Sequence, residues 1–210
     1  MQQKKSRGAL FIVSAPSGAG KTTLCRELVA SLEDLSFSVS YTTRQPRPGE
    51  VNNRDYTFVG REEFLSMITR DEFIEWAEVH GALYGTSKKR LDDIMDSGAD
   101  VVLDIDTQGA MQIRKKYQAG TYIFVLPPSM EILRQRLEKR MTDSEEAIQK
   151  RLRTSVSEIR TYLEYDYVII NDIFESALKK FKAIIIAHRV KTERIDPLWV
   201  EESFLKQEEC

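Results

Sequence analysis

The sequence predicts an α/β fold in which helices cover both faces of a parallel sheet. Short apolar runs such as Val101–Leu103 and Ile123–Leu126 alternate with amphipathic segments. Strands that are apolar at every position are typical of a parallel sheet buried on both faces. The glycine-rich segment Ala15–Thr22 lies between an apolar run and a segment of helical periodicity. That placement is typical of the phosphate-binding loop (P-loop) of a nucleotide-binding core.

The elements of this core follow in order along the chain. Apolar runs predict strands at residues 8–14, 37–41, 101–105, 121–126 and 167–171. Periodic apolar positions predict helices at residues 21–32, 61–69, 87–97, 107–117, 129–140, 145–164 and 174–193. The helix at 145–164 has one apolar stripe, formed by Ile148, Leu152, Val156, Ile159 and Leu163, and is expected to be capped by Thr142 or Asp143.

Residues 42–86 interrupt this alternation. Proline and glycine keep the segment 42–50 from being helical, and short β-like pieces follow at 56–59, 73–79 and 84–86. We therefore expect a single domain over 1–210. Its core is formed by 1–36 and 87–210, a mostly β lobe is inserted at about 37–86, and a short helical lid lies at about 136–151.

Composition excludes several classes of protein. The net charge of −2 indicates no general affinity for nucleic acid, and no apolar run approaches the length of a membrane span. The N-terminal residues lack the apolar segment of a signal peptide, and the two cysteines do not form a disulfide framework. A cytoplasmic protein is expected, and its oligomeric state is open. The tail after Ile195 is expected to pack on its own core or on another subunit.

The glycine-rich segment predicts a site for ATP and Mg²⁺. Gly18 and Gly20 let the backbone turn its N–H groups toward one point, next to the positive end of a helix. Lys21 is placed to reach the β- and γ-phosphates, and the Thr22 hydroxyl suits Mg²⁺. The alternative is an ordinary turn that binds nothing.

A loop rich in arginine is the candidate site for a phosphorylated acceptor. Arg44, Arg47 and Arg54 lie close together in the sequence, and guanidinium forks match phosphate oxygens. Tyr56 and Tyr84 add phenolic donors. The alternative is a solvated charged loop.

Carboxylates in apolar surroundings are candidates for recognition and metal binding, because an unpaired buried carboxylate is costly. Glu75 lies within Phe73–Val79, and one carboxylate can accept both the N1–H and the amine of guanine. A strand carboxylate paired with a neighbour is the alternative for Glu75. Asp104 ends an apolar strand and suits Mg²⁺ and its waters; capping the 107–117 helix is its alternative role.

Taken together, these motifs resemble those of the guanylate kinase family over nearly the whole chain. The matching stretches are 14–23, 38–58, 73–79, 84–86, 103–109, 126–129, 136–140, 145–151 and 168–172. The resemblance implies that ATP is held by Ala15, Pro16, Ser17, Gly18, Ala19, Gly20, Lys21, Thr22 and Thr23, with Asn171 nearby, and Mg²⁺ by Thr22 and Asp104. It implies that GMP is held by Ser40, Arg44, Arg47, Tyr56 and Tyr84, and that guanine is read by Glu75, Thr86 and Asp106. It assigns charge neutralisation during transfer to Lys21, Arg44, Arg136, Arg140 and Arg151.

The chain departs from the family pattern at three places. Ala15 and Asn53 stand where glycine is usual, and asparagine tolerates a left-handed backbone better than most residues. Lys139-Arg140-Met141 replaces Gly-Arg-Gly in the lid, which affects its flexibility more than its charge.

The expected reaction is ATP + GMP ⇌ ADP + GDP, with dGMP as a further acceptor, in purine nucleotide metabolism. No general base is needed, because phosphoryl transfer depends mostly on positioning and charge neutralisation. Two other functions are open: a binding module without catalysis, as in guanylate-kinase-like scaffold domains, and a P-loop kinase for another phosphorylated acceptor.

Overall fold

Two sheets organise the computed structural model of the chain, which describes residues 6–79, 81–117, 120–139 and 144–206. The strands are β1 (Leu10–Ser14), β2 (Leu35–Phe37), β3 (Tyr41–Thr42), β4 (Thr57–Phe58), β5 (Phe73–Val79), β6 (Ala82–Ser87), β7 (Asp100–Asp104), β8 (Thr121–Leu126) and β9 (Tyr167–Ile170). The helices are α1 (Lys21–Ser31), α2 (Arg61–Thr69), α3 (Lys88–Asp96), α4 (Thr107–Lys116), α5 (Met130–Glu138), α6 (Glu145–Ile159), α7 (Phe174–Arg189) and α8 (Pro197–Val200). Short helical turns are η1 (Arg160–Glu164), η2 (Thr192–Arg194) and η3 (Glu201–Leu205).

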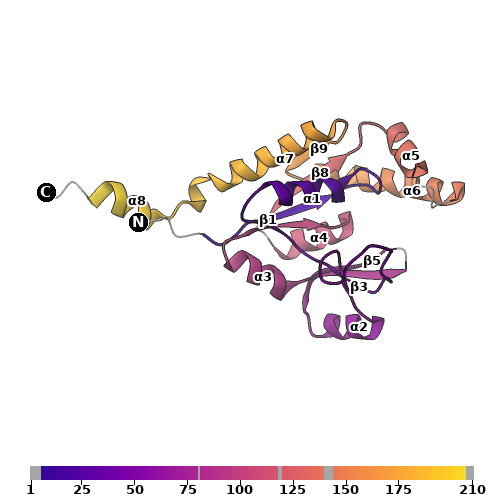
Figure 1. The fold of residues 1–210 in the computed structure, drawn as a ribbon, viewed down its shortest axis with the longest axis horizontal. Coiled ribbons are helices and arrows are strands. Elements are labelled where there is room, and N and C mark those ends of the chain that lie inside the picture. The colour runs from indigo at the N-terminus through magenta and orange to yellow at the C-terminus, as the bar shows by residue number, and fades with distance from the viewer. Residues whose placement is uncertain (1–5, 80, 118–119, 140–143, 207–210) are drawn as a thin grey trace.

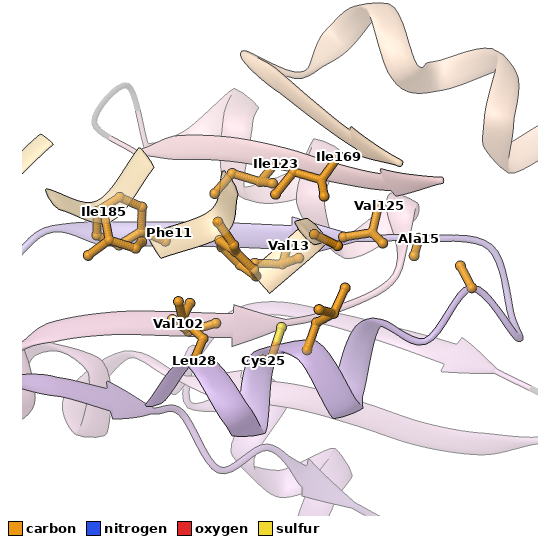
Figure 2. Packing of buried hydrophobic residues seen from close by; sticks show 14 of the residues in the cluster. Phe11, Val13, Ala15, Cys25, Leu28, Val102, Ile123, Val125, Ile169 and Ile185 are labelled. Carbon is orange, nitrogen blue, oxygen red and sulfur yellow. The ribbon is translucent and has the colours of Figure 1, made fainter. Parts of the chain in front are cut away.

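The larger sheet has the strand order β2-β7-β1-β8-β9, and all its neighbouring strands are parallel. Successive residues of β1 point to opposite faces. Phe11 and Val13 pack with α1 and α7, as Figure 2 shows for this face, while Leu10 and Ile12 pack with α3 and α4. The predicted parallel sheet with helices on both faces is thereby confirmed.

The smaller sheet, in the order β4-β3-β6-β5, forms the inserted lobe. β3 pairs with β4 in parallel, whereas β6 is antiparallel to both β3 and β5. Helix α2 covers it and shares a small core made of Phe64, Met67, Phe73 and Leu83. In Figure 1 the lobe lies to one side of the larger sheet, below α4 and to the right of α3.

One predicted strand, 37–41, is divided between the two sheets. Its first part is the end of β2, and the backbone N–H of Ser38 still donates to Val102 O at 3.1 Å. Its last residue begins β3 in the lobe. The apolar pattern is continuous across this point, so the sequence does not show that the chain leaves one sheet for the other.

The helix predicted at 145–164 ends at Ile159 and continues as the 3-10 turn η1. Its N-cap is Ser144, whose side chain accepts from the N–H of Ala147; the expected caps Thr142 and Asp143 lie outside the described residues. Ile148 is buried, but Val156 and Leu163 are 43% and 76% exposed, so the expected stripe is wrong at those two positions.

The chain end from α8 to η3 extends away from both sheets (Figure 1). Leu198, Phe204 and Leu205 are each more than 60% exposed, and Trp199 packs edge-to-face on Phe204 at 5.4 Å. Packing of these side chains on the chain's own core, the first of the two expectations, is therefore wrong. Within the described part of the chain, no helix is long and apolar enough to cross a membrane.

Two neighbouring isoleucines of α7 allow a matched test of the core. Ile185 is fully buried against the sheet, and Ile186 is 50% exposed. We expect Ile185→Ala to lower the free energy of unfolding by about 2–5 kcal/mol, because it leaves a cavity. Ile186→Ala should change it by less than about 1 kcal/mol. Urea unfolding measures both, and equal losses would contradict the packing described.

Candidate functional site

The loop between β1 and α1 has the shape of an anion-binding cradle. Gly18 and Gly20 have φ of 96° and 91°, the left-handed conformation that glycine adopts without strain. A Cβ at Gly20 would lie 2.5 Å from Nδ2 of Asn171, so glycine is required there for space as well. Ala15 is not among the described residues with positive φ. It is nearly buried, and alanine therefore fits in place of glycine.

Two residues from distant elements hold this loop. Nδ2 of Asn171, which follows β9, donates to Ala19 O at 2.7 Å. Nη1 of Arg136, on α5, donates to the same carbonyl at 3.2 Å, and its Nη2 donates to Asn171 O at 2.8 Å. Both residues were expected near the donor nucleotide, and the structure places them against its predicted loop.

Lys21 and Thr22 meet Asp104 at the carboxyl end of β7. Lys21 Nζ lies 2.6 Å from Asp104 Oδ1, and Thr22 Oγ1 donates to Oδ2 at 2.6 Å. Burial lowers the pKa of Lys21, but the Asp104 carboxylate outweighs this effect and the net shift is upward. Helix capping, the alternative role for Asp104, belongs to Asp106, whose Oδ1 accepts from the N–H of Gly109 at 2.8 Å.

Oxygen ligands for a hard cation are present here. Thr22 and Asp104 supply a hydroxyl and a carboxylate side by side, which suits Mg²⁺, an ion that keeps several waters and takes few protein ligands. Among the described residues, no group of three or more His, Cys, Asp or Glu is arranged to hold a metal.

Some of the residues predicted to bind the phosphorylated acceptor lie together at the arginine loop. The guanidinium of Arg44 lies over the ring of Tyr56 at 5.2 Å, and the rings of Tyr56 and Tyr84 are 6.0 Å apart. Arg47 is exposed at the rim. Arg54 turns aside to pair with Asp55 at 2.9 Å. Asn53 has φ 62°, as its substitution for glycine predicts.

Ser40, another predicted acceptor residue, is half-buried at the entry to β3. Its carbonyl accepts from Thr57 N at 2.9 Å and ties the segment before β3 to β4.

Glu75, Thr86 and Asp106 meet where the lobe contacts the core. Thr86 Oγ1 donates to Glu75 Oε1 at 2.6 Å, and Glu75 is only 4% exposed. Burial raises the pKa of Glu75 to about 7, with a further upward contribution from Asp106. A Cβ at Gly109 would lie 2.6 Å from Glu75 Oε2 and 3.6 Å from Asp106 Oδ1. The two carboxylates therefore lie close together over the N-terminus of α4.

The sequence analysis missed two further residues of the site, Gly109 and Glu158. Gly109 is needed because Glu75 approaches its Cα. Glu158, on α6, accepts from the backbone N–H of Ser17 in the phosphate loop, and burial raises its pKa, while Lys21 lowers it. Glu158 lies seven residues after Arg151 and therefore on the same face of α6. This spacing is the pattern in the sequence that could have indicated Glu158.

The predicted lid arginines are only partly described. Arg136 is on α5, Arg151 is half-buried on α6, and Arg140 lies outside the described residues. Leu133 and Leu137 of α5 pack on Ile148 of α6, so the two helices form one unit.

Known proteins resemble the chain along most of its length. A family model described as "Guanylate kinase" matches residues 7–188. A guanylate kinase of Geobacter sulfurreducens is 52% identical over 191 residues, covering 91% of this chain and 94% of the relative. One from Escherichia coli (strain K12) is 51% identical, covering 90% and 92%. The crystal structure of guanylate kinase from Anaplasma phagocytophilum is 37% identical with a TM-score of 0.78, covering 95% and 97%.

Proposed function

The chain belongs to the guanylate kinase family and phosphorylates GMP with ATP, and from this premise we propose which residues carry out the reaction. The observation that supports the proposal most is the pair of carboxylates, Glu75 and Asp106, which lie close together near the end of β7, the strand whose Asp104 pairs with Lys21 of the phosphate loop. It fits an acceptor that presents two adjacent donors, as guanine does.

The donor site is formed by residues 15–23, with Asn171 and Arg136 as braces. Its backbone N–H groups and Lys21 bind the phosphates of ATP. Thr22 and Asp104 hold Mg²⁺, which when bound neutralises phosphate charge. Asp104 pairs with Lys21 and thereby keeps the ammonium at the site.

The acceptor site is formed by the lobe, about residues 37–86. Arg44, Arg47, Tyr56 and Tyr84 bind the GMP phosphate, and Glu75, Thr86 and Asp106 read guanine with the help of Ser40. Since none of these groups depends on the 2′-hydroxyl, dGMP is an acceptor too. Arg136, Arg140 and Arg151 belong to a lid, about 136–151, that closes on the phosphates and excludes water.

A panel of acceptors tests the assignment. With ATP and Mg²⁺, ADP release should require GMP or dGMP, and AMP and ribose bisphosphate should be poor acceptors. Equal rates with a ribose bisphosphate would favour a kinase for another acceptor. Binding of GMP without any turnover would favour a scaffold module.

Protonation of Glu75 should weaken guanine binding. The carboxylate accepts hydrogen bonds only when ionised, and its pKa is about 7 in the free protein. We therefore expect guanosine to bind about tenfold more weakly at pH 6 than at pH 8. Guanosine is used as a competitive inhibitor because the phosphate of GMP titrates near pH 6 itself.

Glu75→Gln is the control for this pH dependence, and its guanosine binding should be flat over the same range. A raised carboxyl pKa also means that ionisation destabilises the free fold. Its stability should thus fall as the pH rises from about 4.5, the ordinary pKa of the carboxyl, to about 7 in the wild type, and level off above that; Glu75→Gln should not show this fall. A flat wild-type profile would contradict the role of Glu75.

The lid arginines should affect rate more than GMP affinity. Removing one arginine from a transferring phosphoryl group can cost 10³ or more, but here candidate arginines share the charge, and we expect Arg151→Ala to lower kcat by about 10–100-fold. Calorimetry should give an almost unchanged Kd for GMP. If affinity falls and kcat does not, Arg151 belongs to the acceptor site.

The place of action is also proposed to be the cytoplasm. The thiol of Cys25 is free and buried against the sheet, and free thiols are typical of a reducing compartment.

A further inference from the structure

The carboxylate of Glu50 accepts two hydrogen bonds from one edge of the Arg44 guanidinium. Nη1 of Arg44 donates to Oε2 at 3.0 Å and Nη2 donates to Oε1 at 2.9 Å. Both side chains are less than a fifth exposed. Such a bidentate, charge-assisted pair is stronger and more specific in its geometry than a single hydrogen bond. It raises the pKa of Arg44, and the Arg44 hydrogen bond lowers the pKa of Glu50, so both stay charged.

Other contacts fix the plane and the remaining donors of Arg44. The carbonyl of Gln45 accepts from Nη1 at 2.8 Å, so both hydrogens of Nη1 are engaged. The rings of Tyr56 and Phe58 lie 5.2 Å and 5.8 Å from the guanidinium carbon. The fork and the Gln45 carbonyl do not use the edge formed by Nε and Nη2. This edge can face a further anion together with the Tyr84 hydroxyl, which interacts with the same guanidinium.

Glu50 is itself anchored by the loop. Its Oε2 accepts from the backbone N–H of Arg47 at 2.7 Å, and its own N–H donates to Arg47 O at 3.0 Å. The backbone bond closes the turn that carries Glu50, and the bond to Oε2 holds its carboxylate. Displacing the carboxylate from Arg44 would break the Oε2 bond in addition to the fork.

From this geometry we infer that Glu50 is a positioning residue, which holds Arg44 so that its Nε–Nη2 edge faces the phosphate of GMP. The inference rests on the proposed acceptor site. Two effects of Glu50 on GMP oppose each other. Its charge repels the phosphate, whereas its fork removes the rotamer freedom that Arg44 would otherwise lose on binding. Positioning outweighs repulsion here, because the fork and the backbone anchor make Glu50 part of the loop.

The test compares GMP with guanosine, which lacks the phosphate. Glu50→Gln keeps an oxygen for the Arg47 N–H but loses the charge and half of the fork. We expect its KM for GMP to rise about tenfold, the size of one charge-assisted hydrogen bond. Inhibition by guanosine, the KM for ATP and the melting temperature should be unchanged, and kcat should stay within about threefold. Glu63→Gln, on the exposed side of α2, is the matched control and should change none of these values.

Two further variants separate positioning from a structural role. Glu50→Asp keeps the charge but is too short for the full fork, and it should also raise the KM for GMP. In an Arg44→Ala background, Glu50→Gln should add less than about twofold, because its effect passes through Arg44. Tighter binding of GMP by Glu50→Gln would mean that Glu50 competes with the phosphate and would overturn the inference. An equal loss of guanosine binding would overturn it too, by showing a general effect on the loop.

A failure of the proposed function has a different signature. It would appear in the wild type, as no ADP release with GMP, before any variant is compared.

Discussion

Replacing Lys21 with alanine should nearly abolish turnover, with kcat falling by about 10³ or more. Lys21 is the ammonium at the phosphate loop, and Asp104 holds it at 2.6 Å in the free protein. When ATP binds, the ammonium follows the charge that shifts between the β- and γ-phosphates during transfer. Its loss therefore costs more in the transition state than in the bound ground state. Steady-state kinetics should show the fall in kcat with the Kd for GMP changed less than threefold.

Two controls make this result specific. Lys89→Ala removes an exposed lysine whose ion pair with Asp93, at 2.8 Å, lies within α3, and should leave kcat unchanged. Because Lys21→Ala leaves the Asp104 carboxylate without its ammonium, the melting temperature is measured as well. Lys21→Arg keeps the charge and should unfold like the wild type while still losing most of the rate. Near-normal kcat in either Lys21 variant would contradict the assignment of the loop.

Glu75→Gln should collapse the preference for GMP over AMP. Sites that pair a polar group of the substrate reject analogues lacking it by about 10⁴, and AMP offers an acceptor at N1 and no 2-amine. With AMP, the buried Glu75 and the half-buried Asp106 of the wild type would gain no hydrogen bond from the base. In the variant, an amide N–H can face the guanine donors, so the kcat/KM for GMP falls strongly while that for AMP does not.

The measurement is kcat/KM for GMP, dGMP, IMP and AMP in both proteins. IMP keeps N1–H and lacks the amine, so it should fall between GMP and AMP. Glu78→Gln is the matched control, since Glu78 lies on the same strand with an exposed side chain. The KM for ATP should not move. If AMP matches GMP in the wild type, or if Glu75→Gln leaves the ratio as it is, the carboxylates do not read guanine.

The elements with strong local signals were predictable. Continuous apolar strands, helical periodicity and the glycines of the phosphate loop depend on residues near one another in the sequence. The predicted helix 61–69 is confirmed residue by residue as α2, and the positive φ of Asn53 follows from the residue type that replaces glycine. The prediction was wrong where two sheets share one apolar pattern. Residues 37–41 were expected to form one strand, but the chain passes from the larger sheet to the smaller sheet within them.

The sequence by itself determined the class of fold, the phosphate loop and the set of charged residues available to the site. Only the tertiary structure decided how those residues are paired. Asp104 and Asp106 are two residues apart, and the sequence offered helix capping as an alternative role for Asp104, yet Asp104 pairs with Lys21 and Asp106 caps α4. Asn171 reaches Ala19 across 152 residues because β8 lies between β1 and β9 in the parallel sheet. Such pairings depend on strand order and register, which bring distant ends of parallel strands to one edge, whereas periodicity and turn chemistry act over a few residues.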